Sequence, residues 1–146
     1  MEASSYPQVK AGDGYSVGHL DDLGEGYGFR KVRKGLGVEA FGVNAIVMPP
    51  GYATGFHYHE EQDELYFVHR GTMEIEFGDG SVHQLPEGTF AHVDAHTLRR
   101  LRNVGESDDA IYVCVGGKGG YIGRDGRAPE GENAHGDGPP GAVGAG

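Results

Sequence analysis

Short apolar runs separated by turn-forming residues make up the middle of the chain, from residue 37 to residue 116. The turn signals combine glycine with proline or aspartate, as at 49–51, 78–80 and 86–88. Between 73 and 77 an apolar residue alternates with glutamate, which is the period of a strand that buries one face. This pattern predicts eight strands, at 38–48, 54–59, 64–70, 72–77, 81–85, 89–93, 98–103 and 110–115.

One stretch, 60–68, is compatible with two structures. Its acidic start is typical of the first turn of a helix. Tyr66 and Phe67 favour a strand instead, and Gly71 ends the run too early for a long helix. Strands at this spacing predict an all-β sandwich or barrel in a single domain.

The two flanks differ from this core in composition. Residues 1–36 are polar and rich in glycine, and we expect a docking arm or leading strand there, anchored by Tyr27 and Phe29. Residues 117–146 contain much glycine and proline and little that is apolar, so a flexible tail is predicted.

Composition limits the possible partners and compartments. The 28 glycines among 146 residues favour turns over long helices. A formal net charge of −10 argues against binding to nucleic acid or to an anionic membrane. The single cysteine excludes an intramolecular disulfide and fits a reducing compartment. Because residues 1–10 lack the apolar stretch of a signal peptide and no apolar run is long enough to span a bilayer, we expect a cytoplasmic protein.

The residues with the clearest chemistry lie between 57 and 66. In a strand His57 and His59 point to the same side, and a four-residue loop would make a hairpin with His59 opposite Glu64 and His57 opposite Tyr66. Opposed β-carbons lie about 4.5–5.5 Å apart, close enough for an imidazole and a carboxylate to reach one ion at about 2.0–2.2 Å. Buried without partners, these groups would cost several kcal/mol, and a divalent metal is one way to offset that cost.

The spacing around these residues resembles the first motif of the cupin superfamily. That motif is Gly, five residues, His-x-His, three or four residues, Glu, six residues, Gly, and it runs here from Gly51 through His57, His59 and Glu64 to Gly71. The resemblance implies a small jelly-roll β-barrel with a metal inside, and His57, His59 and Glu64 take the ligand positions. It also implies a homodimer.

The second cupin motif is only partly present. Its first glycine and its final asparagine match Gly88 and Asn103, but Asp94 and His96 stand where the motif has proline and glycine. Arg99 stands where the motif has its fourth ligand, a histidine. Arginine has no free lone pair and stays protonated, so it cannot ligate a metal.

Arg99 therefore has three possible arrangements. It swings aside and leaves His57, His59, Glu64 and water around the metal; it holds a carboxylate or enolate substrate that also touches the metal; or it pairs with Glu64 and replaces the metal altogether. A cation and a divalent ion about 6 Å apart repel by roughly 5 kcal/mol at an effective dielectric of 20, so Arg99 should not point at the ion without an anion between them.

Two imidazoles and one carboxylate leave coordination positions open, which suits oxygen chemistry at iron(II) or Lewis-acid chemistry such as isomerisation or decarboxylation. The predicted function is a metal-binding cupin that acts on or binds a small anionic organic molecule, with iron, manganese, nickel or zinc as the metal. In this interpretation Arg99 clamps the substrate anion and Tyr66 shapes the pocket. The alternative is a metal-free, non-catalytic barrel that binds a small molecule and pairs Arg99 with Glu64.

Further polar residues have two interpretations each. Gln62 and Asp63 are either solvated loop residues or spare ligands. His92 and His96 are either turn or surface residues or, after a register slip, a third imidazole. Cys114 lies in an apolar run and is predicted to be a small buried residue rather than a nucleophile.

Overall fold

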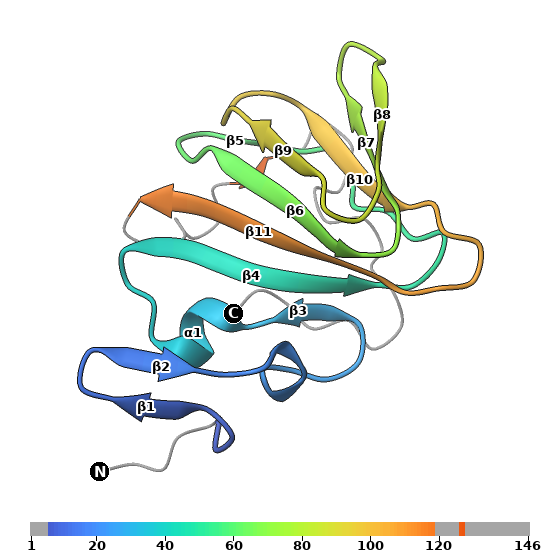
Figure 1. The fold of residues 1–146 in the computed structure, drawn as a ribbon. Coiled ribbons are helices and arrows are strands. Elements are labelled where there is room, and N and C mark those ends of the chain that lie inside the picture. The colour runs from blue at the N-terminus through green and yellow to red at the C-terminus, as the bar shows by residue number, and fades with distance from the viewer. Residues whose placement is uncertain (1–5, 119–125, 128–146) are drawn as a thin grey trace.

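The computed structural model describes residues 6–118 and 126–127, and within them the fold is almost entirely β. Two main sheets face each other (Figure 1). The larger sheet contains, in spatial order, β3 (Gly28–Arg30), β4 (Phe41–Met48), β11 (Ala110–Lys118), β6 (Glu64–Arg70) and β9 (Phe90–Val93). The smaller sheet contains β10 (Arg99–Asn103), β7 (Met73–Phe77) and β8 (Val82–Leu85). All pairings within both sheets are antiparallel.

Shorter elements complete the described chain. A hairpin of β1 (Lys10–Gly12) and β2 (Tyr15–Val17) precedes the 3-10 helix η1 (Leu20–Asp22), and α1 (Val32–Leu36) follows β3. The two-residue strands β5 (Tyr58–His59) and β12 (Gly126–Arg127) pair with each other. Apart from 117–118 and 126–127, the predicted tail lies outside the described residues.

The N-terminal region adds one strand to the larger sheet. β3 pairs with β4, and Phe29 lies opposite Ile46 and packs against the hydrophobic core. The expected leading strand is thus β3, while the β1–β2 hairpin and α1 were not predicted, because short polar runs rich in glycine carry little periodicity.

The hydrophobic core lies between the two sheets. Both sheets contribute buried side chains to one cluster: Ile46, Met48, Tyr66, Val68, Met73, Ile75, Leu85, Val93, Leu101, Ala110, Tyr112 and Cys114. In β7 the alternation is as predicted, since Met73 and Ile75 are buried while Glu74 and Glu76 are more exposed. The two sheets do not share a ladder among the described strands, so they form a double-sheet jelly roll rather than a closed barrel.

The predicted strand 54–59 and the hairpin built on it are wrong. Only β5 is a strand there, and the segment before it lies against β10 of the smaller sheet. His57 and Arg99 exchange two backbone hydrogen bonds of 2.9 Å, and the Thr54 amide donates to the Leu101 carbonyl at 2.8 Å. β6 lies between β11 and β9, so it has no free edge for a hairpin partner. Residues 60–63 therefore cross from one sheet to the other.

The alternative of a helix over 60–68 is also wrong, because β6 begins at Glu64. No helix within residues 6–118 and 126–127 combines the length and apolar character needed to cross a bilayer.

Replacing Ile75 by Ala should lower the free energy of unfolding by about 2–4 kcal/mol, because the side chain is 1% exposed and its removal leaves a cavity between the sheets. Urea denaturation followed by circular dichroism measures the change. Glu76→Ala is the matched control on the outer face of the same strand and should cost less than about 1 kcal/mol. Equal losses for the two variants would contradict this placement of β7.

Candidate metal centre

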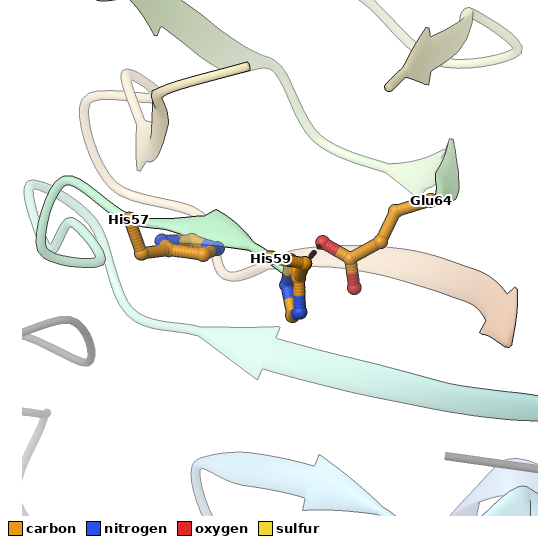
Figure 2. Close-up of side chains that lie close together, drawn as sticks. All are labelled: His57, His59 and Glu64. Carbon is orange, nitrogen blue, oxygen red and sulfur yellow. Dashed lines mark ion pairs between the residues drawn. The ribbon is translucent and has the colours of Figure 1, made fainter. Parts of the chain in front are cut away.

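Two histidines and a glutamate meet between the sheets. His57 and His59 come from the segment that lies against β10, and Glu64 is the first residue of β6 in the opposite sheet. Figure 2 shows His59 directed at Glu64 from a separate strand, and the His59 Nε2 to Glu64 Oε1 distance is 3.0 Å. The potential ligand atoms of all three residues lie within 4.8 Å of one another. The three residues lie close together as predicted, but they come from segments in facing sheets and not from the two strands of a hairpin.

The His57 imidazole is held in a form that can donate a lone pair. Its Nδ1 lies 2.9 Å from the Gly55 carbonyl oxygen, which can only accept a hydrogen bond, so Nδ1 carries the proton and Nε2 is free to ligate. Burial lowers the pKa of His57 to about 4; the bond to Gly55 opposes this shift and the charge of Arg99 adds to it. His57 is therefore neutral at neutral pH. Metal-binding histidines are commonly fixed in this way by a backbone carbonyl.

Glu64 is a buried carboxylate surrounded by donors. Its Oε1 accepts hydrogen bonds from Arg99 Nη2 at 2.8 Å and from the Tyr66 hydroxyl at 2.5 Å. Its Oε2 accepts one from the Cys114 thiol at 3.0 Å. Burial alone raises the pKa of Glu64, but hydrogen bonds from His59, Cys114 and Tyr66 outweigh burial and bring the pKa well below its usual value. The carboxylate is therefore charged.

Arg99 is enclosed completely, with 0% of its surface exposed. Its Nη1 donates to the carbonyl oxygens of Ala95 at 3.1 Å and Thr97 at 2.7 Å, and its Nε donates to the Tyr66 hydroxyl at 3.4 Å. With Nη2 bound to Glu64, the structure shows the ion pair among the three predicted arrangements. Contact between Arg99 and a substrate anion stays a prediction.

Tyr66 does not lie opposite His57 as predicted. Its ladder partners are Cys114 on β11 and Ala91 on β9. The ring is buried and packs edge-on against Tyr112, with ring centroids 6.1 Å apart. Burial and the neighbouring Glu64 charge raise the pKa of Tyr66, so its hydroxyl keeps its proton and donates to the carboxylate.

Two residues on β11 that the sequence interpretation missed belong to the site. Cys114 is buried as predicted, but its thiol also contacts Glu64. The period of two could have indicated this, because it places Cys114 on the same face as Ala110 and Tyr112. Gly116 pairs with Glu64 in the ladder, and an added Cβ would lie 2.6 Å from the Asp63 carbonyl oxygen, so the close approach requires glycine.

Neither His92 nor His96 supplies a third imidazole. His92 Nε2 lies 3.4 Å from Asp63 Oδ2 and 3.7 Å from Asp94 Oδ1, in an exposed cluster outside the core. His96 is also exposed, and its Nε2 lies 2.7 Å from the Glu60 carbonyl oxygen. The interpretation of both as surface or turn residues is confirmed.

The residues of the crossing segment and the second motif have structural roles. Gln62 is buried, so its prediction as a solvated loop residue is wrong, whereas Asp63 is exposed and accepts from the Ala95 amide at 2.9 Å. The buried amide of Asn103 donates to the Met48 carbonyl oxygen at 2.9 Å. Arg100 and Arg102 point outward, as their positions in β10 predict, and pair with glutamates of β7.

The fold and the cluster together place the chain in a class of small proteins: two antiparallel sheets that enclose two histidines and a glutamate. The family model described as the Cupin domain matches residues 44–116, which is half of the 146-residue chain. The chain therefore belongs to the cupin domain family. A search of curated proteins found no match.

Solved structures with the same fold are distant in sequence. The protein TT1209 from Thermus thermophilus is 20% identical with a TM-score of 0.57, over 70% of this chain and 96% of that one. A cupin 2 domain-containing protein from Halorhodospira halophila is 19% identical with a TM-score of 0.56, over 64% of this chain and 61% of that one. A structure from a study of the DMSP lyases RdDddP and RnDddQII is 22% identical with a TM-score of 0.50, over 60% of this chain. The match spans only 43% of that structure's chain. These likenesses support the cupin fold.

Metal-free protein should lose stability as the pH falls from about 6.5 to about 4. The pKa of His57 is about 4 in the folded protein, against 6.5 for an unperturbed histidine, so between these values the unfolded chain binds a proton that the folded one does not. The stabilising contribution is complete above pH 6.5 and is lost toward pH 4. Urea midpoints measured across this range, in the presence of a chelator, give the slope.

The variant His57→Asn should flatten that slope, whereas His83→Asn, at an exposed position on β8, should leave it unchanged. A slope that persists in His57→Asn would show that another group titrates. The depressed pKa of Glu64 acts in a separate window, because its contribution is lost only as the pH falls below 4.5.

Proposed function

We propose that this cupin binds one divalent transition metal through His57, His59 and Glu64, together with a small anionic organic ligand. The observation that carries the proposal is the convergence of two imidazoles and a charged carboxylate between the sheets. Two ligand atoms that are each about 2.1 Å from an ion and at right angles to each other lie about 3.0 Å apart. The distance of 3.0 Å between His59 Nε2 and Glu64 Oε1 fits that spacing.

The contacts around the ligands also support a metal site. Ligating carboxylates are usually hydrogen-bonded to neighbouring groups, and here the Cys114 thiol donates to Glu64 Oε2 while Arg99 and Tyr66 donate to Oε1. The Gly55 carbonyl fixes the His57 ring. These residues would hold the ion, which when bound supplies Lewis-acid or oxygen-activating chemistry at its open positions.

The charges at the site favour an anionic ligand. Arg99 cancels the charge of Glu64, and His57 is neutral at neutral pH, so this pair and His57 together add no net charge beside the ion. Two unit charges about 4 Å apart interact by about 4 kcal/mol at an effective dielectric of 20, which is enough to select a carboxylate or enolate over a neutral molecule. The proposed reaction is of the oxygenase, isomerase or decarboxylase type, with Tyr66 and Arg99 keeping Glu64 in place.

A second candidate is a metal-free cupin domain that binds a small molecule without turnover. The ion pair of 2.8 Å between Arg99 and Glu64 favours it, because the guanidinium already satisfies the carboxylate that would ligate the metal. The two candidates differ in one measurable quantity, which is the affinity for the ion.

The full chain, stripped with chelator and titrated with iron(II), manganese, nickel or zinc, should bind about one equivalent of at least one metal. Glu64→Gln and His59→Asn should each weaken binding at least about tenfold, because each removes a ligand. His83→Asn, an exposed histidine on β8, is the control and should bind as the unmodified chain does. Less than about a tenth of an equivalent bound, both as purified and after titration, would contradict the metal site and favour the second candidate.

Replacing Arg99 by His should tighten metal binding by about tenfold or more, because a cation beside Glu64 is exchanged for a neutral donor. The affinity is measured by competition with a chromophoric chelator, and thermal unfolding verifies that the variant is folded. Arg100→His, on the outward face of β10, should leave the affinity unchanged. Weaker binding by a folded Arg99→His variant would show that the residue does not face the site.

A further inference from the structure

Cys114 lies on the inner face of β11, at the centre of the larger sheet. Its ladder partners are Asn44 on β4 and Tyr66 on β6, and the side chain is 6% exposed. Its Sγ lies 3.0 Å from Glu64 Oε2. A thiol beside a carboxylate in this position donates its S–H proton, and the charge of the acceptor strengthens a bond that is otherwise weak.

The donors around Glu64 are divided unequally between its two oxygens. Oε1 is contacted by Arg99 and Tyr66 and lies 3.0 Å from His59 Nε2. Among the residues that the structure describes, Cys114 is the donor on Oε2. Rotation about the Cγ–Cδ bond moves both oxygens together, so a contact on Oε2 adds to the contacts on Oε1 in fixing the plane of the carboxylate.

We propose that Cys114 is a positioning residue of the metal centre: its thiol holds Glu64 Oε2 so that Oε1 stays directed at His59. The inference rests on the proposed function, because the orientation of Glu64 matters to an ion shared with the histidines. Gly116 allows β11 to approach the start of β6 closely, since a Cβ there would lie 2.6 Å from the Asp63 carbonyl oxygen.

The first experiment compares three variants of the full chain by metal titration. Cys114→Val removes the donor at similar volume and should weaken binding about tenfold, the size of effect typical of groups that orient a ligand. Cys114→Ser keeps a donor and should restore affinity to within about threefold. Val68→Ala is the control, because Val68 is fully buried in the same core without contact to Glu64, and should reduce stability but not affinity.

With cobalt(II) bound, the visible absorption spectrum adds a readout of coordination that a loss of stability does not change. Cys114→Val should alter the ligand-field bands, and Cys114→Ser and Val68→Ala should leave them as in the unmodified chain. If Cys114→Val is folded and binds metal with unchanged affinity and spectrum, the positioning role is overturned while the proposed function stands.

A second experiment reads the contact without any metal. The chain contains one cysteine, so the S–H stretching band in the Raman spectrum belongs to Cys114. In the folded protein this band should lie at lower frequency than in the urea-unfolded chain, and Glu64→Gln should move it part of the way back, because the acceptor loses its charge. If the S–H frequency is the same in the folded and the unfolded chain, the contact between Cys114 and Glu64 is contradicted. If the frequency shift is present but the unmodified chain binds no metal, both the proposed function and the positioning role are contradicted.

Discussion

The buried ion pair between Glu64 and Arg99 is the interaction on which the rest of the site depends. Glu64 begins a strand of the larger sheet and Arg99 begins a strand of the smaller one, so the pair joins the two sheets across the core. Removing one partner of such a pair leaves an uncompensated charge, which typically costs about 3–5 kcal/mol. The carbonyl oxygens of Asp94, Ala95 and Thr97 and the Tyr66 hydroxyl accept from Arg99, and together with the donors around Glu64 they make burial of both charges tolerable.

The same ion pair also sets the net charge at the site. An arginine stands where the cupin motif has a fourth ligand, and it is hydrogen-bonded to Glu64. A centre with three ligands and a neutralised carboxylate holds an ion less tightly than one with four, and it attracts an anion more strongly once the ion is present. Metal and ligand binding are therefore expected to reinforce each other.

Most strands could be predicted from the sequence because they depend on local spacing, whereas His57, His59 and Glu64 were grouped by the cupin motif and come together from facing sheets. The alternation of apolar residues and glutamate predicted β7 correctly. The hairpin could not be excluded locally, because whether β6 has a free edge is decided by β9 and β11, which lie far along the chain. The same non-local pairing places Arg99 beside Glu64. Cys114 could have been found from parity alone.

The crossing segment 60–63 has a thermodynamic consequence. Since the imidazoles lie against one sheet and the carboxylate belongs to the other, the three groups converge only when the sheets are associated. An occupant bound to both sides has no comparable affinity for the unfolded chain, and it stabilises the native state in proportion to the logarithm of its concentration. A ligand bound between the sheets would therefore raise the free energy of unfolding, and separation of the sheets would release that ligand.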